Sequence, residues 1–213
     1  MRVHGPAFLE ALAAARAVAI IRARSPEAAA EGMAAAVRGG FRVVEITLNT
    51  PGALEVIGAL ARREGLLVGA GTVLTATDAE AAVRAGAEFL VSPVMDEAML
   101  AGAQALGTAF VPGCATPTEM LRAHRAGAAA VKLFPAPAGG PEWVRAVLGP
   151  LPELRIVPTQ GVDATNAAAW LAAGAVAVGA GPALFPPEEL TARRWDAIEE
   201  RARALLAAVR TAA

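Results

Sequence analysis

Short apolar runs alternate with Ala-rich helical stretches along most of the chain. Eight of these runs read as buried β-strands, because near-continuous apolar segments are typical of parallel strands covered on both faces. The predicted strands are Val18–Arg22, Val43–Leu48, Leu67–Ala70, Phe89–Ser92, Ala109–Pro112, Ala130–Phe134, Arg155–Pro158 and Ala175–Val178. An extra helix over Pro6–Ala15 is predicted before the first strand, and the longest amphipathic helix over Thr191–Val209.

Turn and cap residues divide the pattern into repeated strand–helix units. Glycines that fit left-handed helix caps recur every 20 to 25 residues, at Gly40, Gly65, Gly86, Gly107, Gly127, Gly149 and Gly174. Helix starts are predicted at Ser25-Pro26, Thr77-Asp78 and Thr116-Pro117. Eight such units favour a single (β/α)₈ TIM barrel of the α/β class. The competing solenoid needs a leucine-rich or helix-pair consensus, and none is visible.

Composition narrows the class of protein. No change in composition marks a linker, so we expect one domain over residues 1–213. A net charge of -1 gives no electrostatic footprint for nucleic acid. The single cysteine, Cys114, excludes an internal disulfide and a multi-cysteine zinc site, and no cluster has metal-ligand spacing. Glycines and prolines interrupt the longest uncharged stretch, 164–187, so we expect a cytoplasmic protein without a membrane span.

Two charged residues stand inside apolar strands. Glu45 lies between Val44 and Ile46, and Lys132 lies between Val131 and Leu133. A charge buried in this way costs several kcal/mol unless it is paired. A structural ion pair inside the barrel is one interpretation. The other is chemistry, because both residues lie near the C-terminal ends of their strands, where barrels carry their active sites.

Lys132 is also the only lysine of the chain, beside 18 arginines. A lysine amine that is taken out of water can lose its proton near neutral pH and attack a carbonyl carbon to form a Schiff base. Arginine cannot do so because it stays protonated. A nearby carboxylate such as Glu45 could move protons during the reaction. The pair therefore predicts carbonyl chemistry through an imine, without naming the carbonyl compound.

Glycine-rich turns follow the last two predicted strands, at Gly161 and at Gly179 and Gly181. Barrels commonly bind phosphate at this position through backbone N–H groups. Tight turns without a ligand are the alternative interpretation. A phosphorylated small molecule is the partner that these turns favour.

Seven motifs on successive strands carry a family resemblance: VAIIRARS, VVEITLNTP, VGAGTVLT, FLVSPVMDE, FVPGCATPTE, AVKLFPA and IVPTQGV. Together they resemble the bacterial 2-keto-3-deoxy-6-phosphogluconate (KDPG) aldolase and 4-hydroxy-2-oxoglutarate (KHG) aldolase family, class I aldolases of the Entner–Doudoroff pathway. The resemblance runs from about Val18 to Leu184. It implies a homotrimer of single-domain barrels, each a lyase that needs no cofactor or metal. It assigns the Schiff-base lysine to Lys132 and the general acid/base to Glu45.

The resemblance also implies a set of substrate-binding residues. Thr72 matches the residue that holds the pyruvate carboxylate, and Pro93 and Phe134 match residues that line the pyruvate pocket. Thr159 and Gly161 match the segment near the sugar C4 hydroxyl and the phosphate. Arg22 matches an arginine that is found in many members.

Three positions depart from the family pattern. Asn49 stands where an arginine is frequent, Gln160 where a glycine is usual, and Pro182 where a serine is usual. Pro182 has no N–H to offer a phosphate. The LNTP and PGCAT segments are similar to the 6-phosphogalactonate branch, whereas Thr47 and Thr159 are similar to the gluconate branch.

The expected reaction is the cleavage of KDPG to pyruvate and glyceraldehyde 3-phosphate, since the Thr159 hydroxyl favours the gluconate series. The galactonate epimer and KHG are the alternative substrates. A barrel that binds a phosphorylated ligand without turnover is a third possibility.

Overall fold

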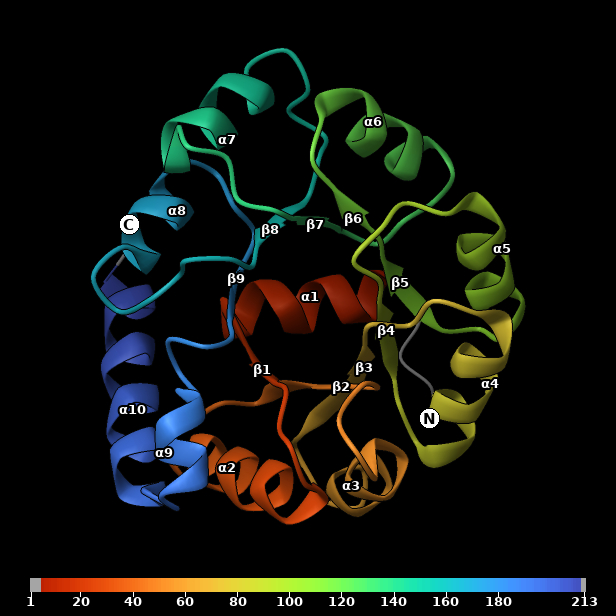
Figure 1. The fold of residues 1–213 in the computed structure, drawn as a ribbon. Coiled ribbons are helices and arrows are strands. Elements are labelled where there is room, and N and C mark those ends of the chain that lie inside the picture. The colour runs from red at the N-terminus through yellow and green to blue at the C-terminus, as the bar shows by residue number, and fades with distance from the viewer. Residues whose placement is uncertain (1–4, 212–213) are drawn as a thin grey trace.

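A ring of parallel strands forms the centre of the computed structural model, which describes residues 5–211. The strands are β1 (Ala17–Ile21), β2 (Val43–Thr47), β3 (Leu67–Gly71), β4 (Phe89–Val91), β5 (Ala109–Val111), β6 (Gly113–Cys114), β7 (Val131–Leu133), β8 (Ile156–Pro158) and β9 (Val178–Ala180). They pair in the orders β5-β4-β3-β2-β1-β9 and β6-β7-β8. Figure 1 shows the ring and the helices that surround it.

Backbone hydrogen bonds join the two sets of strands into a barrel. The Val176 N–H donates to the Ile156 carbonyl at 3.0 Å, next to β8 and β9. On the other side the Ala129 N–H donates to the Phe110 carbonyl of β5 at 3.3 Å. Pro112 separates β5 from β6, so these two short strands together fill the fifth position of the barrel. The predicted TIM barrel is confirmed.

Ten helices connect the strands or cover the barrel within residues 5–211. They are α1 (Gly5–Ala15), α2 (Pro26–Arg38), α3 (Ala53–Leu60), α4 (Ala76–Ala85), α5 (Glu97–Ala105), α6 (Pro117–Arg125), α7 (Gly140–Leu148), α8 (Ala167–Ala172), α9 (Pro187–Thr191) and α10 (Trp195–Thr211). In this range no helix is both long and apolar enough to cross a membrane.

Side-chain caps explain where several helices begin. Ser25 caps α2 and Thr116 caps α6, as predicted. The predicted start at Thr77-Asp78 was wrong by two residues. Thr75 is the N-cap of α4, because its hydroxyl accepts the Asp78 N–H while the Asp78 carboxylate accepts the Thr75 N–H.

Two further boundaries differ from the prediction. The long C-terminal helix is divided, because the chain turns between α9 and α10 with Arg193 in the left-handed conformation (φ 52°). The last strand runs through Gly179 rather than ending at Val178, since it pairs with β1 in the register Val18↔Gly179. Gly179 is therefore a strand residue and not part of a loop.

The barrel has separate cores outside and inside the ring of strands. The larger core lies between the strands and the surrounding helices. The inner core contains alternate strand residues such as Val18, Val43 and Phe89, and it is closed at the N-terminal ends of the strands by Phe8 and Leu12 of α1. The rings of Phe8 and Phe89 lie 4.9 Å apart. The opposite end, where the strands finish, is left for the site.

Candidate active site

Glu45 lies inside the barrel at the centre of β2. It pairs in register with Ile20 of β1 and Gly69 of β3, and only 2% of its surface is exposed. Its Oε1 has no hydrogen-bond partner among the described residues. Burial raises the pKa of Glu45 above its ordinary value, and the positive charges of Lys132 and Arg22 offset part of that rise. A buried carboxyl of this kind is suited to carry a proton in a reaction.

Lys132 occupies the middle of β7, where its backbone pairs with Gly113 and Val157. Its side chain is partly buried, and Nζ lies 5.2 Å from the centre of the Phe134 ring. The aromatic face stabilises a cation at this distance and covers one side of the amine. Phe134 itself is 38% exposed, so it stands at the mouth of the barrel.

Glu45, Lys132 and Thr159 line the same cavity inside the barrel. Its volume is about 20 Å³, which is enough for one water molecule. A single water between a carboxyl and an amine provides a path for proton transfer. Glu45 and Lys132, which were predicted to be neighbours across the barrel, line one cavity. Their side chains form no ion pair with each other.

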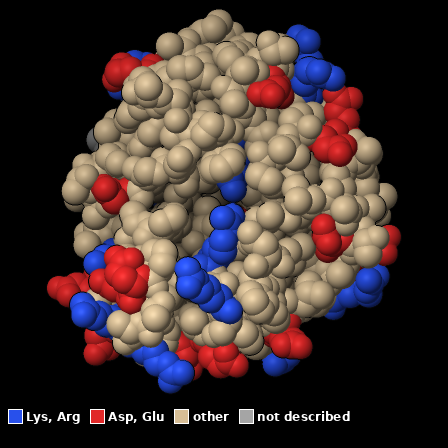
Figure 2. Space-filling view, viewed as in Figure 1, with Lys and Arg blue, Asp and Glu red and all other residues tan. Residues whose placement is uncertain are grey.

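Arg22 and Asn49 stand beyond the C-terminal ends of β1 and β2. The side chains of Val18 and Ile20 face the barrel interior, so the alternation along β1 brings Arg22 to the same side just beyond its end. Arg22 and Asn49 both line a larger pocket of about 1100 Å³. Figure 2 shows basic side chains in a row from the central hollow toward the rim, with acidic side chains at the periphery. The mouth of the barrel is therefore suited to anions.

Two glycines of β3 make room for the buried carboxyl and its neighbours. A Cβ atom on Gly71 would lie 2.6 Å from Cδ of Glu45. A Cβ atom on Gly69 would lie 2.6 Å from Cε1 of Phe89. Sequence reasoning missed both residues as parts of the site. Their alternate positions on a strand next to Glu45 were the available signal.

Thr72 follows β3 with a φ of 58°. A β-branched residue in the left-handed region costs on the order of 1–3 kcal/mol, and such strain gathers at functional sites. Pro93 follows β4 and is partly buried; a Cβ atom on Gly113 would collide with its carbonyl. Both residues lie at the C-terminal ends of their strands, as predicted, but neither lines the two pockets described above.

The predicted phosphate segments divide into two environments. The Thr159 hydroxyl donates to the Leu133 carbonyl at 3.4 Å, and its methyl group packs where a Cβ atom on Gly179 would stand. Gly161 is exposed with a φ of 67°, and its carbonyl accepts the Asn166 side-chain amide at 2.7 Å. Gly181 begins the loop after β9. Of the three glycines that were predicted to form phosphate-binding turns, Gly179 is a strand residue. Gly161 and Gly181 lie in the loops after β8 and β9.

Cys114 plays no part in this cluster. It is buried in the outer core, and burial raises the pKa of its thiol to about 12. A thiol in that state is a poor nucleophile. Within residues 5–211, no group of three or more His, Cys, Asp or Glu side chains could hold a metal ion.

The chain is similar to known aldolases over most of its length. It is 36% identical over 171 residues to 2-dehydro-3-deoxy-6-phosphogalactonate aldolase of Escherichia coli, with 79% of this chain and 83% of that protein covered. It is 37% identical over 175 residues to 2-dehydro-3-deoxy-phosphogluconate aldolase of Pseudoalteromonas atlantica, covering 81% of each.

A solved structure gives the same result. KDPG aldolase from Legionella pneumophila, with pyruvate captured at low pH as a covalent carbinolamine intermediate, superimposes with a TM-score of 0.83 at 30% identity. The match covers 92% of this chain and 97% of that one. The family model for KDPG and KHG aldolase matches residues 9–201. With a buried carboxyl and a lone lysine in one barrel cavity, the chain belongs to the KDPG and KHG aldolase family.

Proposed function

We propose that the protein is a class I aldolase that cleaves KDPG to pyruvate and glyceraldehyde 3-phosphate. The observation that carries the proposal is the cavity that Glu45 and Lys132 share. The only lysine of the chain lies there, beside a carboxyl whose pKa is raised by burial. The relatives named above act on substrates of this class, and the Legionella enzyme holds pyruvate covalently.

The reaction begins at the substrate C2 carbonyl. The neutral Lys132 amine attacks this carbon, and loss of water from the carbinolamine gives a protonated imine. The imine accepts the electron pair of the C3–C4 bond as that bond breaks. Glu45 takes the C4 hydroxyl proton through one water in the cavity, so that C4 leaves as the aldehyde of glyceraldehyde 3-phosphate.

The second half returns the enzyme to its starting state. The enamine that remains on Lys132 takes a proton at C3 and becomes the imine of pyruvate. Water attacks this imine and frees pyruvate and the amine. Thr72, Pro93 and Phe134 border the pyruvate end of the substrate. Arg22 stands between that end and Asn49, Gly161, Gly179 and Gly181, which surround the end that carries the phosphate. No metal ion or organic cofactor takes part in any of these steps.

The choice of C4 epimer rests on Thr159. Relatives named for the gluconate and galactonate substrates are equally similar to this chain, at 37% and 36% identity. Thr159 lines the reaction cavity, and while its hydroxyl donates to the Leu133 carbonyl, its oxygen can still accept a hydrogen bond. We assign this hydroxyl to the C4 hydroxyl of the gluconate series. KHG is the second candidate substrate, because the family model that matches the chain includes KHG aldolases.

The deciding assay measures pyruvate release from the two C4 epimers and from KHG side by side. The proposal expects the highest kcat/KM with KDPG. Thr159→Val keeps the shape of the side chain and removes the hydroxyl, so the preference for KDPG over its epimer should fall by about tenfold. A wild-type preference for the galactonate epimer or for KHG would reassign the substrate. Ligand binding without pyruvate release from any of them would favour the non-catalytic barrel.

We further propose that the enzyme is a homotrimer. The large apolar side chains Leu54, Leu74 and Val94 are 40%, 52% and 51% exposed. They follow β2, β3 and β4, which are adjacent strands, so they lie on neighbouring segments at one side of the barrel mouth. Light scattering of the purified protein should give three times the 21.5 kDa of one chain. The mass of a monomer would contradict the proposal.

A further inference from the structure

Two arginines follow β1 and lie two residues apart in the sequence. Arg22 and Arg24 are both exposed, and both line the pocket of about 1100 Å³ beside the barrel mouth. Neither forms an ion pair or a hydrogen bond with another residue of the range 5–211. Their donors are therefore available to a ligand in the pocket.

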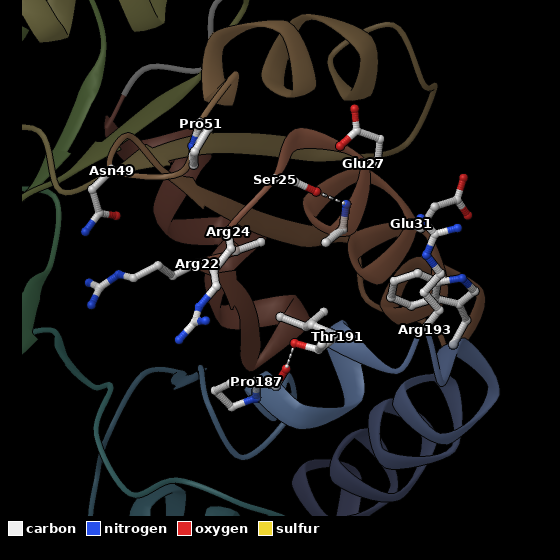
Figure 3. Close-up of a pocket in the computed structure, with 14 residues that line it drawn as sticks. Arg22, Arg24, Ser25, Glu27, Glu31, Asn49, Pro51, Pro187, Thr191 and Arg193 are labelled. Carbon is white, nitrogen blue, oxygen red and sulfur yellow. Dashed lines mark hydrogen bonds between the residues drawn. The ribbon is translucent and has the colours of Figure 1, made fainter.

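The charges of this pocket are separated. Figure 3 shows Arg22, Arg24 and Asn49 on one side, with both arginine side chains directed away from Glu27 and Glu31. Arg193 lies on the side of Glu31. An anion is thus attracted to the end of the pocket that holds Arg22 and Arg24, away from the carboxylates at the other end.

The two arginines differ in their distance from the reacting carbon. Arg22 directly follows β1, and its charge reaches Glu45 and lowers the pKa of that carboxyl. Arg22 therefore belongs with the reacting end of the substrate. Arg24, two residues further along the chain, faces the part of the ligand that lies away from Lys132. In a 6-phosphorylated 2-keto acid the phosphate is that distant part.

The backbone near this point offers few donors. Strand β1 pairs with β9 in the register Ala19↔Ala180, and a Cβ atom on Gly181 would lie 3.9 Å from the Ile20 carbonyl, so the loop after β9 starts beside the end of β1. Pro182 in that loop has no N–H, and the N–H groups of Leu184 and Phe185 both donate to the Gly181 carbonyl. Of residues 182–185, only Ala183 has a backbone N–H left for a ligand. A side-chain cation would supply the charge that these few backbone donors lack for a phosphate there.

We infer that Arg24 is a specificity-determining residue, which binds the terminal phosphate of the substrate from the β1 side of the mouth. The inference rests on the proposed aldolase function. A guanidinium group can give two parallel hydrogen bonds to a phosphate, and it stays charged at any working pH. Arg24 supplies the charge that the loop after β9 does not.

The test uses the reverse reaction, in which pyruvate condenses with an aldehyde. Wild-type enzyme and Arg24→Gln are compared with glyceraldehyde 3-phosphate and with glyceraldehyde. The ratio of kcat/KM for the phosphorylated over the unphosphorylated aldehyde should fall roughly 10- to 100-fold in Arg24→Gln, mainly through KM. Arg24→Lys should restore part of it. Inorganic phosphate should inhibit wild type competitively and the variant more weakly.

Arg193→Gln is the matched control, since Arg193 lines the same pocket at its other end. It should leave the ratio unchanged. Trapping of pyruvate on Lys132 by borohydride separates this inference from the proposed function, because pyruvate carries no phosphate. If Arg24→Gln traps pyruvate as wild type does but keeps the wild-type ratio, Arg24 does not bind the phosphate. If wild type traps no pyruvate, the proposed function fails and this inference fails with it.

Discussion

The carboxyl group of Glu45 occupies the space that a side chain at Gly71 would need. A Cβ atom on Gly71 would stand 2.6 Å from Glu45 Cδ, well inside van der Waals contact. The two residues lie on the adjacent strands β2 and β3, and Glu45 is buried there with an unpartnered Oε1. Gly71 therefore determines where the acid/base group can stand.

Gly71→Ala should move the Glu45 carboxyl out of the cavity that it shares with Lys132. Because general acid/base catalysis contributes about 10²- to 10⁴-fold, kcat/KM should fall by a factor in that range. Steady-state assays of pyruvate release measure the effect. Gly102→Ala is the control: Gly102 lies in α5, a Cβ atom there meets nothing within 4 Å, and activity should not change. Equal activity of the two variants would show that Gly71 is not needed to position Glu45.

Glu45→Gln should separate stability from activity. Burial raises the pKa of Glu45 above its unfolded value, so the stability contributed by the neutral carboxyl is present at low pH. It is lost as the pH rises through the pKa of the folded state. Glutamine does not titrate, so the variant should be more stable than wild type at neutral pH, with a difference that shrinks as the pH falls.

Urea unfolding over a series of pH values measures this difference, and kcat/KM of the same variant should fall about 10²- to 10⁴-fold. Glu64→Gln, at an exposed position, provides the control curve. A difference in stability that stayed constant with pH would mean that Glu45 does not carry a raised pKa.

Phe8→Ala should destabilise the barrel from its closed end. The Phe8 side chain is 1% exposed and packs against Phe89 inside the ring of strands. Deleting a buried aromatic ring costs about 3–5 kcal/mol of unfolding free energy. Leu9→Ala, on the half-buried side of α1, should cost less. Denaturant unfolding compares the two; similar losses would show that α1 does not close the inner core through Phe8.

Much of the fold and the two central site residues could be predicted from the sequence. Apolar runs and glycine caps repeat locally, so the eight barrel positions follow from short-range patterns. Glu45 and Lys132 stood out because a charge inside an apolar strand needs a reason. These signals come from short stretches of sequence, so they can be recognised without knowing which strands are neighbours in the fold.

The remaining features depend on contacts between distant segments. The collision of a Gly71 side chain with Glu45 arises from the register of two strands, and the left-handed φ of Thr72 has no signal in the local sequence. The position of the loop after β9 beside the end of β1 requires the β1–β9 pairing that closes the ring. The break at Arg193 reflects a turn of the chain that the amphipathic pattern did not contain.

The most direct test of the account is the mass of the protein after treatment with pyruvate and borohydride. Reduction of the imine should add one 1-carboxyethyl group per chain, and peptide mapping should locate it on Lys132, the only lysine of the sequence. Lys132→Arg keeps the charge but cannot form the imine, so it should gain no mass and lose activity by on the order of 10⁴-fold or more. An adduct at another residue, or full activity without any adduct, would contradict catalysis through a lysine imine.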